Sequence, residues 1–264
     1  MAADEAFYEL DGDRATPSEL TRGPWDEDSQ HAGPPAALLG LAMERLPAPA
    51  DTPMRIGRVT YEILRPVPIA PLRVEARIER DGRRVQMLSA SLHAGEDEVM
   101  RARAWRLREE AVELPEGLVP GPLPHRPADG VSGDFFPTGS EVGYHSAVEY
   151  RFITGSFVEP GPATVWMRSR VPVVAGEEIS PLGRVLVVAD SGNGVSATLD
   201  WRRFLFINVD LTVHLHRLPA GEWVCLDAVT LPEPDGIGFA DAALFDERGP
   251  LGRSAQTLLV AARE

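Results

Sequence analysis

Apolar and polar positions along the chain describe a helix followed by alternating runs, and this order occurs twice. In the first half, Gly33-Pro34-Pro35 leads into the apolar segment 36–46, which predicts a helix that starts at the prolines and ends before Pro47. Alternating segments follow at 58–66, 72–80, 84–94 and 98–108. The pair Asp81-Gly82 separates two of them, as in a hairpin. This half is predicted to be a helix and an antiparallel meander.

The second half repeats this plan after two leading strands, which are predicted at 144–153 and 163–171. A helix is predicted from Ser180-Pro181 to Asp190, with Gly192 and Gly194 as its stop. The turn Asp235-Gly236 divides the strands that follow, which are predicted at 208–219, 222–231, 237–249 and 251–260.

A segment rich in proline and glycine separates the halves. Between Glu113 and Ser140 it holds Pro115, Pro120, Pro122, Pro124, Pro127 and Pro137, with five glycines interspersed. Proline removes backbone donors and glycine adds backbone entropy, so the segment is predicted to be a linker. The predicted organisation is a unit at 1–112, a linker at 113–140 and a second unit at 141–264.

Sliding one half onto the other aligns Leu64-Arg65-Pro66 with His216-Arg217-Leu218, and Asp81-Gly82 with Asp235-Gly236. The order and spacing of the elements favour an internal repeat over a chance agreement of strand-rich segments. A long helix packed on a strongly curved antiparallel sheet, duplicated in tandem, predicts an α+β protein with the double hotdog fold. The two units then pair their sheets side by side within one chain.

The second copy carries polar residues where the first has none to match. Asp210 aligns with Arg58, Thr230 with Ala76, and Gln256 with Ala104. Alternation places Asp210, Thr212, His214 and His216 on the strand face that points away from the apolar set. The strands carrying Asp210, Thr230 and Gln256 are expected to be neighbours in one sheet, so the three side chains are expected to converge.

Such a trio suits hydrolysis by an activated water. A carboxylate accepts a proton from water, and a hydroxyl and an amide hold that water in line. The developing oxyanion needs a donor, which we expect from the backbone amides of Gly33 and Ala36 at the start of the first helix. Each residue of the trio also has an ordinary structural explanation: a cap or ion pair, a common strand residue, or a wet sheet face.

The composition and the net charge limit the classes of partner that the protein is expected to bind. The formal net charge of −14 disfavours nucleic acid and anionic membrane surfaces. The arginines at 101, 103, 106 and 108 either form a local patch for an anionic ligand or, as we favour, one solvated strand face. The single Cys225 lies in an apolar run and is predicted to be a buried structural thiol. We expect a cytoplasmic protein, because the acidic N-terminus lacks a signal-peptide pattern and no apolar stretch is long enough to cross a bilayer.

Ordered stretches of the sequence resemble the acyl-CoA thioesterase II family, whose members are double-hotdog proteins. They are His31-Ala32-Gly33, Leu64-Arg65-Pro66 and Arg80-Asp81-Gly82 in the first half, and Asp210 to Arg217, Gly221 to Trp223, Asp235-Gly236, Gly238-Phe239 and Gly252 to Gln256 in the second. The helix start departs from the family's Gly-Gly pair.

The resemblance implies hydrolysis of an acyl-CoA thioester without a cofactor or metal. It assigns catalysis to Asp210, Thr230 and Gln256, and substrate contacts to His31 and Gly33. The threonine role reaches Thr230 after a one-residue shift; without it the count from Trp223 ends at Leu231. A homodimer or larger assembly is expected as well.

Three other interpretations of the sequence are a metal site, a hydratase and a binding protein. Asp210, His214 and His216 on one strand face have the chemistry of metal ligands. A hotdog enoyl-CoA hydratase would use an Asp-His pair, for which Asp210 with His214 is the candidate. A non-catalytic acyl-CoA or lipid-binding protein is the alternative outside enzymes. The sequence contains no G-x-S-x-G elbow, which argues against a serine hydrolase.

Overall fold

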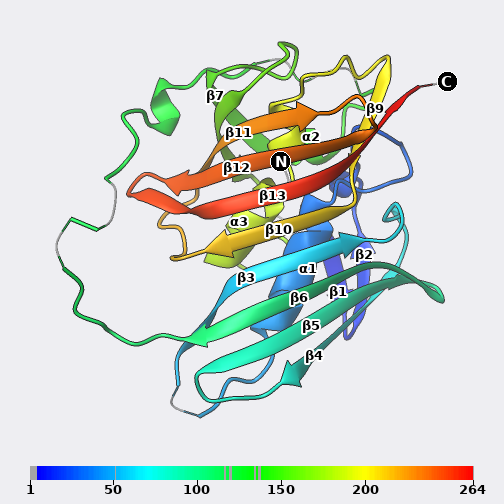
Figure 1. Cartoon of the computed structure of the whole chain (residues 1–264). Helices are drawn as coiled ribbons and strands as arrows, with labels where there is room; N and C mark the ends of the chain where they lie inside the picture. Colours follow the sequence, from blue (N-terminus) through cyan, green and yellow to red (C-terminus); the bar gives the residue numbers. More distant parts are fainter. Residues whose placement is uncertain are drawn as a thin grey trace.

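The strands of both halves join edge to edge in one antiparallel sheet. The structure is a computed structural model that describes residues 5–263 apart from 51, 116, 119, 120, 134, 136 and 137. The first half of the sheet contains β1 (Tyr8–Asp11), β2 (Arg14–Pro17), β4 (Leu72–Arg80), β5 (Val85–Ala94), β6 (Asp97–Arg108) and β3 (Met54–Ile63), in that order. It continues through β10 (Asp210–Leu215), β13 (Gly249–Ala262), β12 (Ile237–Asp246), β11 (Val224–Pro232), β8 (Ala163–Ser169) and β7 (Val148–Thr154), while β9 (Phe204–Asn208) pairs with β13. Figure 1 shows the two sets of strands meeting at β3 and β10.

Two helices pack against each other on the inner face of the sheet. They are α1 (Gly33–Glu44) and α3 (Pro181–Ala189), and the short α4 (Gly192–Val195) follows α3. A Cβ atom on Gly33 would overlap the carbonyl oxygen of Val187, and one on Gly40 would overlap the side chain of Leu186. The glycines therefore let α1 lie directly on α3. Most of α1 is buried as a result.

The junction of the halves is symmetric in register. Thr60 of β3 lies opposite Thr212 of β10, Arg58 opposite His214, and Glu62 opposite Asp210. Exchanging the two strands leaves this pattern unchanged, so residue numbers in the two halves are related by an offset of 212 − 60 = 152. The predicted alignment of Asp210 with Arg58 has this same offset.

The offset holds across the sheet and corrects one predicted match. Val59 pairs with Ala104, and the register of β10 with β13 sets Gln256 at the corresponding place. Ile78 pairs with Leu88 as Thr230 pairs with Ala240, so the counterpart of Thr230 is Ile78 and the match to Ala76 is wrong. The Asp-Gly pairs used for that match occupy different positions in their hairpin loops.

Several local predictions also need correction. Residues 144–147 were expected to begin a strand, but Tyr144–Ala147 forms the helical turn α2 before β7. The predicted strand 208–219 is split into the end of β9 and β10, and β1 and β2 were not expected. Within the predicted linker, Pro127–Asp129 forms the 3-10 helix η2 and Val131 pairs with Phe152, so part of it is packed on the second half. Pro120 and Pro137 lie outside the described residues.

Other predictions hold. The helix predicted at 180–190 is α3, with the Ser180 hydroxyl accepting a hydrogen bond from the Gly183 amide at 2.9 Å. Cys225 is buried, and burial raises the pKa of its thiol. The predicted solvated face holds for Arg101 and Arg103, which form ion pairs with carboxylates, but it is wrong for Arg106, which is buried against Gln86. No helix within the described residues is long and apolar enough to cross a membrane.

Candidate functional site

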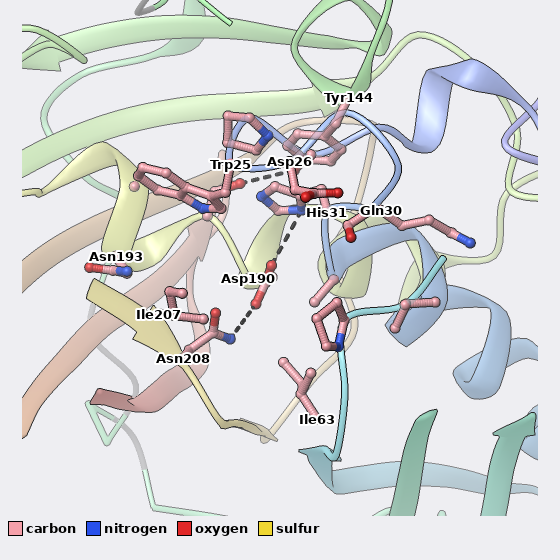
Figure 2. Close-up of a pocket in the computed structure, with 18 of the residues that line it drawn as sticks. Trp25, Asp26, Gln30, His31, Ile63, Tyr144, Asp190, Asn193, Ile207 and Asn208 are labelled. Atoms are coloured by element: carbon pink, nitrogen blue, oxygen red, sulfur yellow. Dashed lines mark hydrogen bonds and ion pairs between the residues drawn. The ribbon is translucent and has the colours of Figure 1, made fainter. Parts of the chain in front are cut away.

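A pocket of about 540 Å³ opens where the start of α1 meets the end of α3. Figure 2 shows His31 and Asp190 facing each other in it, with Trp25, Asp26 and Tyr144 on one side and Ile207 and Asn208 on the other. Its walls come from both halves of the chain. The remaining aromatic lining is Phe135, Tyr150 and Phe157.

The carboxylate of Asp190 is the polar centre of this pocket. Its Oδ1 accepts from Asn208 Nδ2 at 2.8 Å and from Gln256 Nε2 at 3.0 Å. Its Oδ2 lies 3.3 Å from His31 Nδ1, and the side chain is only 5% exposed. Asp190 ends α3, so helix geometry places it against the residues that precede α1. A buried carboxylate with three polar neighbours has a fixed position and orientation.

His31 is held between this carboxylate and an aromatic ring. Its imidazole stacks on the ring of Tyr144 with centroids 3.7 Å apart, and the Tyr144 hydroxyl donates to the Val187 carbonyl at 2.8 Å. Burial lowers the pKa of His31, and the Asp190 charge opposes that effect. A neutral imidazole that donates from Nδ1 to Asp190 has an unprotonated Nε2, which is a base suited to water.

Gln256 lies on the inner face of the sheet, where its side chain contacts both Asp190 and α4. Besides bonding Asp190, it accepts from the Asn193 amide at 3.1 Å through Oε1. Thr230 is in register with Gln256 across Ala240, and its hydroxyl lies 2.8 Å from Ser196 Oγ. The side chains of Thr230 and Gln256 therefore lie on the same face of the sheet. Thr230 contacts Ser196, the residue that follows α4, and does not line the pocket.

The expected convergence of the trio is wrong for Asp210. Asn208 pairs with Leu258 and Thr212 with Ala255, so three residues of one strand lie opposite two of the other. This extra residue is a β-bulge, and it reverses which side chains face inward. Asn208 therefore points to Asp190, whereas Asp210 lies with Thr212 on the outer face and accepts from the Thr257 amide at 2.6 Å. Asp210 does not line the pocket.

Both amides expected to bind an oxyanion have an acceptor within hydrogen-bond distance, but the Gly33 amide is left without it whenever His31 Nδ1 carries a proton. Gly33 N donates to His31 Nδ1 at 3.1 Å, and Ala36 N donates to the Ala32 carbonyl at 3.0 Å. His31 Nδ1 is thus within reach of both the Gly33 amide and Asp190, and it serves one of them at a time in the neutral ring. Of the two predicted substrate contacts, His31 lines the pocket and Gly33 supports His31 from behind.

Asp190 and Asn208 were not singled out from the sequence. A signal was present for Asn208: the first half has the same bulge at Gly57, between Ile56 and Arg58, and glycine inside a strand often marks one. The offset of 152 carries that bulge to Val209. Asp190 sits at a predicted helix end, and nothing in the local pattern distinguishes it from a cap.

The metal reading finds no support at the predicted place. His214 lies opposite Arg253 on the outer face, and Asp210 is bonded to the Thr257 amide. Among the residues that the structure describes, no group of three or more His, Cys, Asp or Glu side chains is arranged to hold a metal ion.

Comparison with protein families and solved structures gives consistent relatives. Residues 115–260 match the model "acyl-CoA thioesterase C-terminal domain" and residues 21–107 match "acyl-CoA thioesterase N-terminal domain". No curated protein matches the sequence.

Three of the solved structures that resemble this chain share its fold across nearly their whole length. A putative thioesterase II from Thermobifida fusca is 19% identical with a TM-score of 0.75, covering 98% of this chain and 96% of its own. A conserved hot dog fold protein from Alicyclobacillus acidocaldarius is 17% identical with a TM-score of 0.72, covering 97% and 96%. Acyl-CoA thioesterase II TesB2 from Mycobacterium marinum is 13% identical with a TM-score of 0.67, covering 97% and 94%.

Proposed function

This chain belongs to the acyl-CoA thioesterase family, and from that premise we propose that it hydrolyses an acyl-CoA thioester to a free acid and CoA at the Asp190–His31 pocket. The observation that carries the proposal is the buried Asp190 carboxylate, fixed by Asn208 and Gln256 and facing His31 across the pocket. This is the arrangement that a water-activating base requires.

In the proposed mechanism, Asp190 accepts the Nδ1 proton of His31 as a hydrogen bond and so leaves Nε2 free to take a proton from water. The hydroxide formed adds to the thioester carbonyl. The protonated imidazole is stabilised by the Asp190 charge and returns the proton to the departing CoA thiolate. Gln256 and Asn208 keep the carboxylate oriented throughout, and the Tyr144 ring holds the imidazole plane.

We also propose that the chain is a double hotdog, with one unit at 1–112, a linker at 113–140 and a second unit at 141–264. The symmetric junction of β3 with β10 supports this division, as does the constant offset between the strands. The two family models meet between residues 107 and 115. The helices of the two units are unequal, with twelve residues in α1 and nine in α3.

Hydration of an enoyl-CoA is the second candidate, because an Asp-His pair also suits that chemistry. The pair is Asp190 with His31, and the pair expected from the sequence, Asp210 with His214, lies on the outer face of the sheet.

One assay separates these functions. The purified chain is incubated with saturated acyl-CoAs of several chain lengths and with an enoyl-CoA, while free thiol and enoyl absorbance are followed together. Thiol release from saturated substrates supports the thioesterase. Loss of enoyl absorbance without thiol release supports the hydratase. Binding of acyl-CoA with neither change would leave the non-catalytic binding protein, and would overturn the proposal.

A further inference from the structure

Three arginines gather beyond the outer end of β9, the strand that forms one wall of the pocket. Arg202 and Arg203 lie in the turn before β9, and Arg263 directly follows β13. The Arg263 amide donates to the Arg203 carbonyl at 2.9 Å, and its Nε donates to the Trp201 carbonyl at 2.8 Å. In Figure 1, β9 lies beside the C-terminal end of the chain. These contacts hold Arg263 beside the turn that contains Arg202 and Arg203.

These guanidinium groups differ from most others in the chain. Many exposed arginines elsewhere are paired with carboxylates, as Arg101 is with Glu98 and Arg253 with Asp241. Within the described residues, no ion pair involves Arg202, Arg203 or Arg263, and all three residues are exposed. Arg202 and Arg203 rest over the neighbouring rings of Trp201 and Phe204, at 5.4 and 5.5 Å from the ring centroids. Arg83 and Arg84 are likewise exposed and in no ion pair among the described residues, but they lie between β4 and β5, in the other half of the sheet from β9.

The nearby acidic groups leave this cluster positive. Asp200 is adjacent in sequence, but its Oδ1 accepts from the Arg202 backbone amide at 2.9 Å. Asp26 lies on the pocket wall, where its Oδ1 accepts from the Asp28 amide. The basic residue that lines the pocket itself, Arg65, is already paired with Asp97 at 3.4 Å.

The pocket runs from the Asp190 site toward the cluster. Leu205, Ile207 and Asn208 line it along β9, and Ile207 and Asn208 are seen side by side in Figure 2. Arg203 precedes Asn208 by five positions, which at the rise of a strand is about 16 Å. An extended pantetheine arm spans a comparable length. A thioester at His31 with its arm along β9 therefore brings its phosphates to the arginines.

We infer that Arg202, Arg203 and Arg263 bind the phosphate groups of the 3′-phosphoadenosine diphosphate end of CoA. This inference rests on the proposed function and extends it, because it distinguishes a CoA thioester from the thioester of a carrier protein. Planar guanidinium groups bind phosphate oxygens in pairs, and Arg202 and Arg203 are held with their charged ends in solvent.

The test compares acyl-CoA with the same acyl group on pantetheine, which lacks every phosphate. The wild-type chain is expected to have a lower KM for acyl-CoA, with similar kcat for both substrates. The double variant R202A/R203A is expected to raise the KM for acyl-CoA by about tenfold and to leave acyl-pantetheine unchanged. Added salt should raise the wild-type KM for acyl-CoA and affect the double variant less.

R248A is the matched control, since Arg248 is exposed, unpaired among the described residues and lies at the opposite end of β13. It should behave as wild type. Calorimetry with CoA and with pantetheine provides a readout that needs no turnover.

The outcomes separate the two proposals. Hydrolysis of both substrates with equal KM, unaffected by R202A/R203A, would overturn the phosphate site and leave the thioesterase intact. Preferential binding of CoA without hydrolysis of either substrate would sink the proposed function and retain the phosphate site. A loss of activity toward acyl-pantetheine in the double variant would show that the arginines support the fold of β9, and would also overturn the site.

Discussion

The two ends of the α1–α3 helix pair are built from similar parts but differ in the space they enclose. At one end Asp190, after α3, faces His31, before α1, and a pocket of about 540 Å³ opens beside them. At the other end the Glu44 carboxylate of α1 accepts from the Ser180 hydroxyl at 2.7 Å, and the cavity there is about 10 Å³. An acid with a polar partner is therefore not enough to make a site.

The difference lies in what surrounds each acid. Around Asp190 the sheet supplies Asn208 and Gln256, whose counterparts in the first half are Ile56 and Ala104 by the offset of 152. Near Glu44, by contrast, Arg106 donates to the carbonyls of Leu46 and Pro47 at 2.8 and 2.7 Å and fastens the chain after α1. The second half has amide side chains that orient the carboxylate, whereas the first half has apolar side chains and an arginine that holds the chain after α1.

The largest effect should come from the two aspartates that are candidates for the catalytic carboxylate. Asp190→Asn is expected to lower kcat/KM by about 10²- to 10⁴-fold, because the imidazole loses its charged partner. Asp210→Asn should retain most of the activity, since its carboxylate bonds the Thr257 amide away from the pocket. Thiol release by both variants measures this directly. Inactive Asp210→Asn beside active Asp190→Asn would restore the assignment made from the sequence.

The amide that distinguishes the copies can be removed from one and added to the other. Gln256→Ala deprives Asp190 and the Asn193 amide of a partner, so kcat/KM should fall by about 10- to 100-fold. Thermal unfolding should show a loss of about 1–3 kcal/mol.

Ala104→Gln provides the reciprocal change. It buries an amide where Ala104 is now 1% exposed, and the expected loss of stability is similar, about 1–3 kcal/mol, with kcat/KM of the folded protein unchanged. A fall in kcat/KM for Ala104→Gln would show that the closed half also contributes to turnover.

A substitution at the end of the helix pair near Glu44, which lacks a large pocket, should change the stability of the chain and leave its activity unchanged. Ser180→Ala removes both the cap of α3 and the hydrogen bond to Glu44, and should lower the free energy of unfolding by about 1 kcal/mol. Denaturant unfolding and thiol release, measured on the same preparation, separate the two readouts. Altered kcat in this variant would contradict a purely structural role for that end.

The smallest effect concerns the protonation of His31. Burial lowers its pKa in the folded chain, so the unfolded chain takes up a proton first as pH falls below about 6.5. The unfolding free energy should thus decline from that pH down to the folded pKa, by up to about 1.4 kcal/mol per pH unit. His31→Asn should lack this component. Equal slopes in both proteins would mean that His31 is not held neutral.

The sequence predicted the helix that ends at Asp190 and the outward face of Asp210, because each depends on local periodicity. It failed for the convergence of Asp210 with Gln256, because the register between distant strands sets Gln256 on the opposite face of the sheet. It failed for Thr230 because the Asp-Gly turns were taken as equivalent, although the hairpins place them differently. Asp190 and His31 meet only through the packing of α1 on α3, and a contact between residues so far apart in the chain leaves no periodic signature.

The bulge at Val209 determines which side chains of β9 face the pocket. If the strand were straightened at its present length, so that Val209 paired with Leu258, Val209 would turn inward in place of Asn208, and an apolar side chain would face the Asp190 carboxylate. The chain would still contain every side chain that the proposed chemistry needs, but Asn208 would no longer face Asp190. The first half has the same irregularity at Gly57, where Ile56 takes the inward place that Asn208 takes in the second half.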